Sequence, residues 1–236
     1  MPLVSPPLHH ARPPAPKAHR LIYRPPTLGK DYWVLDDALA DPMAVRKRLL
    51  AREDWVQGAP KRPESWPGRR AQPALTPEEL NPIETWARAQ TGQKRLYAVT
   101  AAAGTGNQLN HNCVQLVGAG DAGPRPHTDA RRLCRFAAVL YLNPQVPDHC
   151  GTGFYRVRLP DGQLGGNTLP ARFDNLVEAL ETRFVPPDLF VLDQAVDHRF
   201  NRLLVYRADL IHSATAYWGG DEPADQRMAV VLFWMS

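Results

Sequence analysis

The 236-residue sequence is long enough for one sizeable hydrophobic core, and 44% hydrophobic with 22% charged residues is the composition of an ordinary globular protein. The formal net charge of +4, from 28 basic and 24 acidic residues, is too small to indicate a dedicated nucleic-acid-binding protein. No apolar run approaches the ~20 residues of a membrane span, and the N-terminal stretch lacks the apolar core of a signal peptide, so we expect a cytoplasmic protein outside the membrane.

The first 29 residues are crowded with proline, as in "SPPLHHARPPAPK". Proline lacks a backbone N–H and favours extended conformations, so we expect residues 1–29 to form an arm or a strap over the domain rather than a core of their own. The His9-His10 pair in this arm has no further ligand nearby, and we interpret it as part of a solvated tail. Residues 30–236 are expected to form a single domain.

A strand followed by a helix is predicted directly after the arm. The run "YWVLDDAL" is typical of a strand, and "ADPMAVRKRLLARE" follows it. Asp41 is a good N-cap residue, and Pro42 suits the first helical position because its missing N–H would have no partner there. We therefore expect a helix that begins at Pro42.

A second helix is predicted in "TPEELNPIETWARAQTG". Thr76 and Glu79 have the spacing of a capping box, and Gly92 marks the expected end of the helix. Pro82 lies inside this pattern, where proline removes a hydrogen bond, so the helix is expected either to kink there or to begin near Asn81.

After Gln93 the sequence changes to short runs rich in Val, Leu, Tyr, Phe and Trp, separated by turn clusters such as "GAGDAGPRP" and "WGGDEPADQ". Seven or eight such strands in succession favour a sandwich or a jelly roll over alternating strands and helices. One stretch, "ARFDNLVEALETRF", has helical spacing and predicts a short inserted helix. The predicted strands are "RLYAVTAAA", "HNCVQLVGAG", "RFAAVLYLN", "GTGFYRVRL", "DLFVLDQAV", "NRLLVYRADL", "HSATAYW" and "RMAVVLFWM".

Two strong polar side chains, His127 and Asp129, stand just ahead of an apolar strand in "PRPHTDARRLCRFAAVLYLN". One interpretation is a polar turn. The other is a metal site, because residues two apart on a strand point to the same face. A third ligand could come from His212, which follows the strand "NRLLVYRADL", since a jelly roll brings distant strands into one sheet. Two histidines and one carboxylate on one face suit non-haem Fe(II), with zinc as the alternative.

A single arginine begins the last strand, "RMAVVLFWMS". With period-two alternation, Arg227, Ala229, Val231 and Phe233 share one face. If that face is internal, the guanidinium needs an anionic partner, and a carboxylate fits its planar fork. The alternative is an arginine at the solvated rim of the sheet.

The segments "PHTD", "AVLYLN", "GTGFY", "NRLLVYRADLIHSA" and "RMAVVLFW", in this order, resemble the 2-oxoglutarate- and Fe(II)-dependent dioxygenase superfamily. The resemblance is strongest to its prolyl-hydroxylase-like branch and to uncharacterised bacterial relatives, and it covers residues 95–236. It implies a mainly β fold with flanking helices, built on a double-stranded β-helix, the cupin-like jelly roll. It also implies that His127, Asp129 and His212 are the catalytic metal ligands that hold Fe(II).

The same resemblance assigns the binding of the 2-oxoglutarate co-substrate to Arg227 and Tyr141. In the family the arginine commonly follows the distal histidine more closely than here, where 15 positions separate His212 from Arg227. The intervening "WGGDEPADQ" is a polar loop, and loops tolerate insertion. This departure bears on co-substrate binding more than on the metal.

The resemblance further implies hydroxylation of an unactivated C–H bond, with succinate and CO2 as co-products. The retained Asp129 disfavours the related halogenases, which replace this carboxylate. We expect the substrate to be an amino acid, a peptide or a small natural product, and the oligomeric state, monomer or homodimer, stays open. The segment "SWPGRR" is expected to cover the mouth of the site as a loop, and arginines near predicted strand ends could receive an anionic group: Arg125, Arg131, Arg132, Arg156 and Arg158.

Two other functions stay open. The same chemistry could demethylate nucleic acid, although no aromatic-rich groove for a flipped base is evident and we do not expect nucleic acid as a partner. A non-catalytic jelly roll could also use the three ligands as a structural or sensing metal site.

Overall fold

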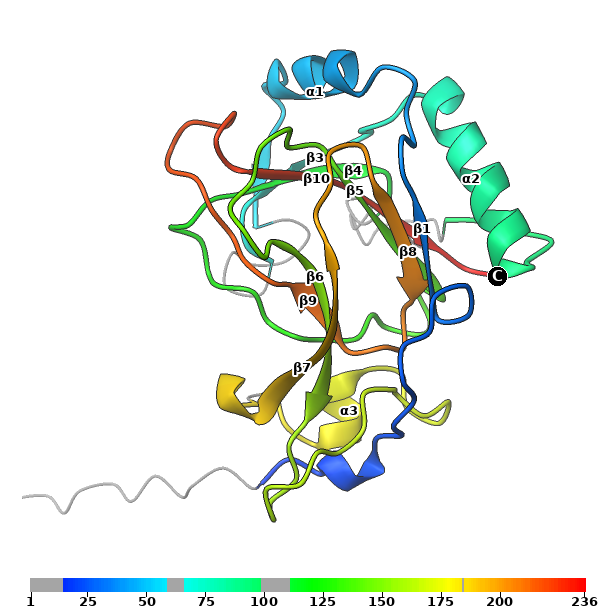
Figure 1. Ribbon diagram of the computed structural model, residues 1–236, viewed down its shortest axis with the longest axis vertical. Coiled ribbons are helices and arrows are strands. Elements are labelled where there is room, and N and C mark those ends of the chain that lie inside the picture. Colours follow the sequence, from blue (N-terminus) through cyan, green and yellow to red (C-terminus); the bar gives the residue numbers. More distant parts are fainter. Residues whose placement is uncertain (1–14, 59–65, 99–110, 184) are drawn as a thin grey trace, which may run out of the picture.

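The computed structural model describes residues 15–58, 66–98, 111–183 and 185–236, and it consists mainly of two antiparallel sheets that face each other (Figure 1). The large sheet has the strand order β1-β8-β5-β10-β4-β3-β2, and the small sheet has the order β7-β6-β9. The strands of the large sheet are β1 (Tyr32–Leu35), β2 (Val56–Gln57), β3 (Arg69–Ala71), β4 (Cys113–Val117), β5 (Phe136–Tyr141), β8 (Leu203–Arg207) and β10 (Arg227–Trp234). Those of the small sheet are β6 (Gly151–Val157), β7 (Phe190–Asp197) and β9 (His212–Ala214).

From β4 onward the chain runs back and forth between the two sheets. In the large sheet β8, β5, β10 and β4 are neighbours in this order. In the small sheet β7, β6 and β9 are neighbours, and His127 continues this row through a bridge to His212 of β9. This alternation is the double-stranded β-helix, so the predicted jelly roll is confirmed.

Both predicted N-terminal helices are present and begin at their predicted caps. The helix α1 (Pro42–Leu50) is capped by Asp41, whose side chain accepts a hydrogen bond of 2.9 Å from the backbone N–H of Ala44. In α2 (Pro77–Thr91) the capping box formed by Thr76 and Glu79 is complete. The helix therefore begins at Pro77 and runs through Pro82, so the predicted start near Asn81 is wrong. The hydrogen bonds of the complete capping box stabilise the first turn by more than the one backbone hydrogen bond lost at Pro82 costs.

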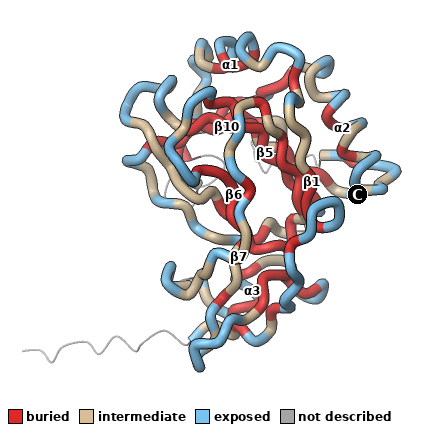
Figure 2. Tube along the Cα trace, viewed as in Figure 1, coloured by how far each residue is buried: buried red, intermediate tan, exposed pale blue. Residues whose placement is uncertain are grey.

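Alternate residues of β10 face two different cores. One set packs beneath α1 and α2 on the outer face of the large sheet: Met228, Val230, Leu232 and Trp234. The other set faces the small sheet, across an inner core that includes Phe154 and Tyr206: Arg227, Ala229, Val231 and Phe233. Figure 2 shows this buried zone along β10 and β5, with the exposed turns of α1 outside it.

The described part of the proline-rich arm packs against the domain. The 3₁₀ turn η1 (Ala18–Arg20) lies beside the short helix α3 (Leu176–Leu180), and Leu21 is buried in the same small core (Figure 1). The backbone N–H of Ile22 donates to the carbonyl of Thr168 at 3.0 Å. His9 and His10 lie outside the described residues.

Two predicted elements differ in extent. Of "RLYAVTAAA", the structure shows only a bridge between Tyr97 and Met235, and residues 99–110 lie outside the described part. The inserted helix is the single-turn α3, followed by the 3₁₀ turn η2 (Pro187–Leu189) before β7. Within the described ranges, no helix has both the length and the apolar character needed to cross a bilayer.

Candidate metal centre

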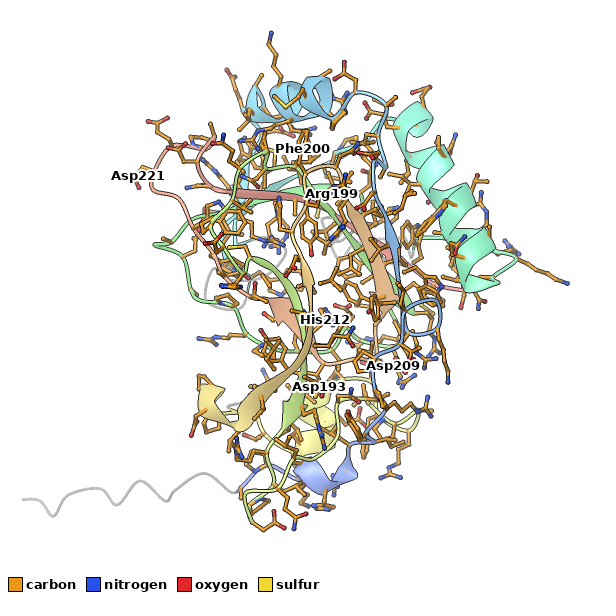
Figure 3. All side chains as sticks on the ribbon, in the orientation of Figure 1. Asp193, Arg199, Phe200, Asp209, His212 and Asp221 are labelled. Carbon is orange, nitrogen blue, oxygen red and sulfur yellow. The ribbon has the colours of Figure 1, made fainter. Side chains whose placement is uncertain are left out.

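The two predicted histidine ligands meet across the edge of the small sheet. The backbone N–H of His127 donates to the carbonyl of His212 at 3.0 Å, and the reverse bond is 2.8 Å. Their ring centroids are 4.5 Å apart. The third predicted ligand, Asp129, lies two residues after His127 and donates its backbone N–H to the carbonyl of Ala208 at 3.0 Å. Figure 3 shows His212 in the middle of the molecule, near the small sheet.

The three side chains converge on one point. One ligand atom from each of His127, Asp129 and His212 lies within 4.8 Å of the others, and theirs is the one such group found in the described part of the chain. The Nε2 of His212 is 3.6 Å from Oδ2 of Asp129, and the Nε2 of His127 is 3.9 Å from Oδ1. These separations fit ligands around a common ion better than direct hydrogen bonds, which are shorter.

Each imidazole is fixed in the tautomer that a metal requires. The Nδ1 of His127 lies 2.9 Å from the carbonyl of Arg125, and the Nδ1 of His212 lies 2.8 Å from that of Leu210. A carbonyl can only accept, so each Nδ1 carries a proton, and the neutral form of each ring presents the lone pair of its Nε2. Orientation by a backbone carbonyl is the usual arrangement of metal-binding histidines.

The carboxylate of Asp129 is buried and incompletely paired. Its Oδ2 has no hydrogen-bond partner in the described structure, and burial raises the pKa of this carboxyl to about 6, an effect opposed by nearby His127. Burial, followed by the proximity of His127, lowers the pKa of His212 well below its usual value. A buried carboxylate oxygen without a partner, beside two imidazoles, is a place that a divalent cation would fill.

The centre is closed on one side and accessible on the other. The side chain of His212 is 5% exposed and that of Asp129 is 10% exposed, whereas that of His127 is 56% exposed. The ring of Tyr206 packs on His212, with centroids 4.5 Å apart. Two nitrogens and one oxygen on one side of an ion leave coordination positions open toward solvent.

A buried cation, Arg227, lies further along the interior. It begins β10 opposite Val117, and its side chain is almost wholly buried, 6.0 Å from the ring centroid of Tyr217. No carboxylate forms an ion pair with Arg227 among the described residues. Tyr141 of the adjacent β5 bonds through its hydroxyl to Thr152 at 2.7 Å; burial raises the pKa of Tyr141, while Thr152 and then Arg227 lower it. The structure therefore brings Arg227 and Tyr141 together.

The long segment between β9 and β10 is accommodated outside the sheet. The backbone N–H of Ala119 donates to Gly219 at 2.9 Å, and the Arg46 side chain donates to the carbonyl of Ala224 at 2.6 Å. These contacts tie the loop to the body of the domain. The arginine that begins β10 thus keeps its place on the inner face despite the longer spacing.

Tyr206 is a candidate site residue that the sequence analysis did not single out. Burial, followed by Asp129, raises its pKa well above the usual value, and Arg227 acts in the opposite direction. The ring of Tyr206 packs against the ring of His212. Its alternation with the inward Leu204 along β8 is the sequence signal that could have identified it.

The expectation that "SWPGRR" is a loop over the mouth is wrong for its second half. Arg69–Ala71 form β3, in which Arg70 lies opposite Gln115, and Gln115 lies opposite Ala229 of β10. Arg70 is therefore buried on the inner face, with its guanidinium 4.7 Å from the ring centroid of Trp66. Three residues were enough to continue the sheet, and such a short polar strand has no apolar alternation to reveal it.

Most of the arginines expected to receive an anionic substrate are engaged within the protein. Arg131 and Arg132 form ion pairs with Asp209 and Asp174, respectively. Arg156 and Arg158 both donate to backbone carbonyls. The fifth, Arg125, is exposed beside His127.

Comparison with solved structures supports the fold. The carbocyclase SnoK, described as a non-heme alpha-ketoglutarate-dependent enzyme from nogalamycin biosynthesis, is 16% identical, with 88% of this chain and 81% of SnoK covered and a TM-score of 0.52. For the epimerase SnoN of the same pathway the identity is 18%, the coverage 88% and 79%, and the TM-score 0.51. A prolyl-4-hydroxylase from Pseudomonas putida is 15% identical over 87% and 92% of the two chains, with a TM-score of 0.46.

This chain thus has the fold of known non-heme alpha-ketoglutarate-dependent enzymes, although identities this low extend no further than the fold. A family model matches residues 20–233, so the chain belongs to the family of unknown function DUF6445. No curated protein matches it.

Proposed function

We propose that this protein is an Fe(II)- and 2-oxoglutarate-dependent oxygenase that hydroxylates an unactivated C–H bond of an amino acid, a peptide or a small natural product. The observation that carries the proposal is the meeting of two tautomer-fixed imidazoles and one unpaired carboxylate within 4.8 Å. The jelly-roll fold and the buried Arg227 add to it, because they supply a place for an anionic co-substrate inside the same jelly roll.

In this proposal His127, Asp129 and His212 hold the iron. Arg227 neutralises the far carboxylate of 2-oxoglutarate, and the hydroxyl of Tyr141, fixed by its bond to Thr152, contributes a further hydrogen bond. When bound, iron, 2-oxoglutarate and O2 together supply the oxidising chemistry, which yields succinate, CO2 and a hydroxylated product.

The protein's own task is to orient its ligands and to exclude water. The carbonyls of Arg125 and Leu210 hold the imidazole rings, so the lone pairs of both Nε2 atoms point at one site. The ring of Tyr206 covers the inner side of His212. The open approach past His127 is where a substrate C–H bond can come near the metal.

The decisive test is the release of succinate from 2-oxoglutarate by purified protein with Fe(II), ascorbate and O2, with and without candidate substrates. Slow release without substrate, and faster release with a true substrate, are expected of the wild type. Asp129→Ala should reduce release at least 100-fold, because removal of one ligand leaves the metal weakly held. A matched control, Asp54→Ala, removes an exposed carboxylate that is paired with Arg52 outside the site, and should behave like the wild type.

Equal succinate release by the wild type and Asp129→Ala would contradict the proposal. If the wild type binds metal tightly but releases no succinate with any substrate, the protein is instead a metal-binding jelly roll without catalysis. Metal analysis of protein purified under nitrogen then shows whether iron or zinc occupies the three ligands.

A further inference from the structure

An ion-pair network lies directly beside the metal ligands. Arg131, two residues after Asp129, donates from Nη2 to Oδ2 of Asp209 at 3.2 Å. Arg207 grips the same carboxylate with two bonds, 3.1 Å from Nε to Oδ1 and 2.8 Å from Nη2 to Oδ2. Asp209 itself lies three residues before His212, so the network connects both ligand-bearing segments.

Most of this network is removed from water. The Asp209 side chain is 8% exposed and that of Arg131 is 15% exposed. Arg131 also donates to the backbone carbonyl of Leu169, and Asp209 accepts from the N–H of Leu169 through its own carbonyl at 2.8 Å. Ion pairs with low exposure and several hydrogen bonds hold one geometry much better than pairs in solvent.

The network and the histidine pair hold Asp129 from both sides. Before it along the chain, the backbones of His127 and His212 are joined by their two reciprocal bonds. After it, Arg131 is joined to Asp209. Between these ties, the backbone N–H of Asp129 makes one bond to Ala208, and its Oδ2 has no partner in the described structure. The orientation of the Asp129 carboxylate therefore depends on how the chain segments before and after this residue are held.

We propose that Asp209, through Arg131 and Arg207, is a positioning residue that holds the segment of Asp129 and the segment of His212 at metal-ligand distance. The inference rests on the proposed function, because it concerns the same metal centre. Groups that orient metal ligands are commonly worth about 10- to 100-fold in metal affinity, although they never touch the ion.

The molecule offers a matched control for this network. Asp36 also accepts from two arginines: Arg202 binds it with two bonds of 2.6 and 3.1 Å, and Arg199 with one of 2.9 Å. This second network joins the end of β1 to the turn between β7 and β8 and carries no proposed ligand. Figure 3 shows Arg199 near one end of the barrel, with Asp209 beyond His212 toward the other end.

The experiment is a titration of metal-free protein with Co(II) under nitrogen, followed by calorimetry and by the visible absorption of the bound ion. Asp209→Asn is expected to bind Co(II) at least tenfold more weakly than the wild type and to change the absorption spectrum. Asp36→Asn is expected to stay within twofold of the wild type, with the same spectrum. Asp209→Glu retains a carboxylate and should restore most of the affinity.

A second variant covers the case in which Asp209→Asn does not fold. Arg131→Gln removes the ion pair between the Asp129 segment and Asp209, together with the bond to the carbonyl of Leu169, and leaves the two bonds of Arg207 in place. It is expected to weaken Co(II) binding by a similar factor. Thermal unfolding of all variants without metal separates a general loss of stability, which Asp36→Asn would share, from a specific loss of metal affinity.

The results separate this inference from the proposed function. If the wild type binds Co(II) and both Asp209→Asn and Arg131→Gln bind it with the same affinity and spectrum as Asp36→Asn, Asp209 has no positioning role. If the wild type binds no Co(II), there is no metal centre, and the proposed function is overturned together with this inference.

Discussion

Two regions of the jelly-roll interior differ in charge: the metal end, with His127, Asp129 and His212, and the anion end, with Arg227. At the metal end a buried carboxylate oxygen of Asp129 has no partner in the described structure, and the imidazoles of His127 and His212 lie beside this carboxylate. At the anion end the guanidinium of Arg227 is buried 6.0 Å from the ring centroid of Tyr217, with no carboxylate paired to it in the described ranges. One end lacks a cation and the other lacks an anion, so a metal ion with a chelating dianion would satisfy both.

The largest expected effect tests whether co-substrate binding at the anion end and metal binding at the metal end can be lost independently. Arg227→Gln removes the charge and the bidentate fork, and charge-assisted hydrogen bonds contribute about 1.5–3 kcal/mol each. We expect 2-oxoglutarate affinity, measured by calorimetry under nitrogen with Mn(II) present, to fall about 100-fold. Metal affinity should stay within twofold, because Arg227 touches none of the ligands.

Asp129→Ala is the reciprocal variant, since it should abolish Mn(II) binding. The control for the anion end is Arg199→Gln, which removes an exposed arginine of the Asp36 network. If Arg227→Gln bound 2-oxoglutarate as tightly as Arg199→Gln did, the buried arginine would have no part in co-substrate binding, and the contrast between the two ends would lose its functional meaning.

The next effect concerns the arm that supports the metal end. Leu21 is 7% exposed and packs in a small core with Leu169 and Ile211, the residue just before His212. Leu21→Ala should lower the free energy of unfolding by about 2–3 kcal/mol, through lost burial and the cavity left behind. Denaturant unfolding measures this, with Ile22→Ala as the control, because Ile22 is 42% exposed and should cost under about 1 kcal/mol. If Leu21→Ala lowered the free energy of unfolding as little as Ile22→Ala does, the packing of the arm would contribute nothing to the stability of the domain.

The third prediction uses the histidine at the anion end. His198 stacks on Tyr141 with ring centroids 4.5 Å apart, and burial, followed by Arg227 and Arg202, lowers its pKa to about 4, whereas its bond to Asn143 acts in the other direction. A histidine whose pKa is depressed in the folded state contributes stability above its unfolded pKa of 6.5, and this stability is lost as pH falls toward 4.

Between pH 7 and pH 4 the wild type should therefore lose about 2 kcal/mol more stability than His198→Phe, a figure reduced for the partial exposure of the ring. Urea unfolding at several pH values measures the difference. Parallel pH curves for the two proteins would show that His198 is not held neutral. An anion on Arg227 should offset part of the effect, so saturating 2-oxoglutarate is expected to make the curve of the wild type shallower.

The sequence predicted those features that depend on local chemistry. Asp41 and the pair Thr76–Glu79 mark their helices because a cap needs only residues within one turn. The apolar strands could be read from their composition, and the H-x-D pair identified His127 and Asp129 as candidates. The three proposed ligands do lie together in the structure, although their role in binding metal is still a prediction.

The features that the sequence did not predict depend on tertiary contacts. Arg70 is buried only because β3 pairs with β4, and nothing in the sequence Arg-Arg-Ala of β3 indicates that pairing. The same holds for Leu21, which stands in the run Leu21–Tyr23 of a proline-rich stretch: it is buried in a core with α3, whereas Ile22 and Tyr23 are exposed. In the sequence Asp209 has the character of an ordinary turn residue, because its partner Arg131 lies 78 positions away and meets it only in the folded chain.

The smallest expected effect comes from a change that touches neither end of the interior. Thr76 caps α2 on the outer face of the large sheet by accepting from the backbone N–H of Glu79. Thr76→Ala should cost about 1 kcal/mol of stability, while Thr76→Ser should cost only a few tenths. Because α2 packs on the face of β10 opposite Arg227, we expect both variants to bind Co(II) and 2-oxoglutarate as the wild type does. A loss of either affinity in Thr76→Ala alone would show that the outer core and the two ends of the interior are coupled through the large sheet, so that the metal end and the anion end could no longer be treated as separate sites.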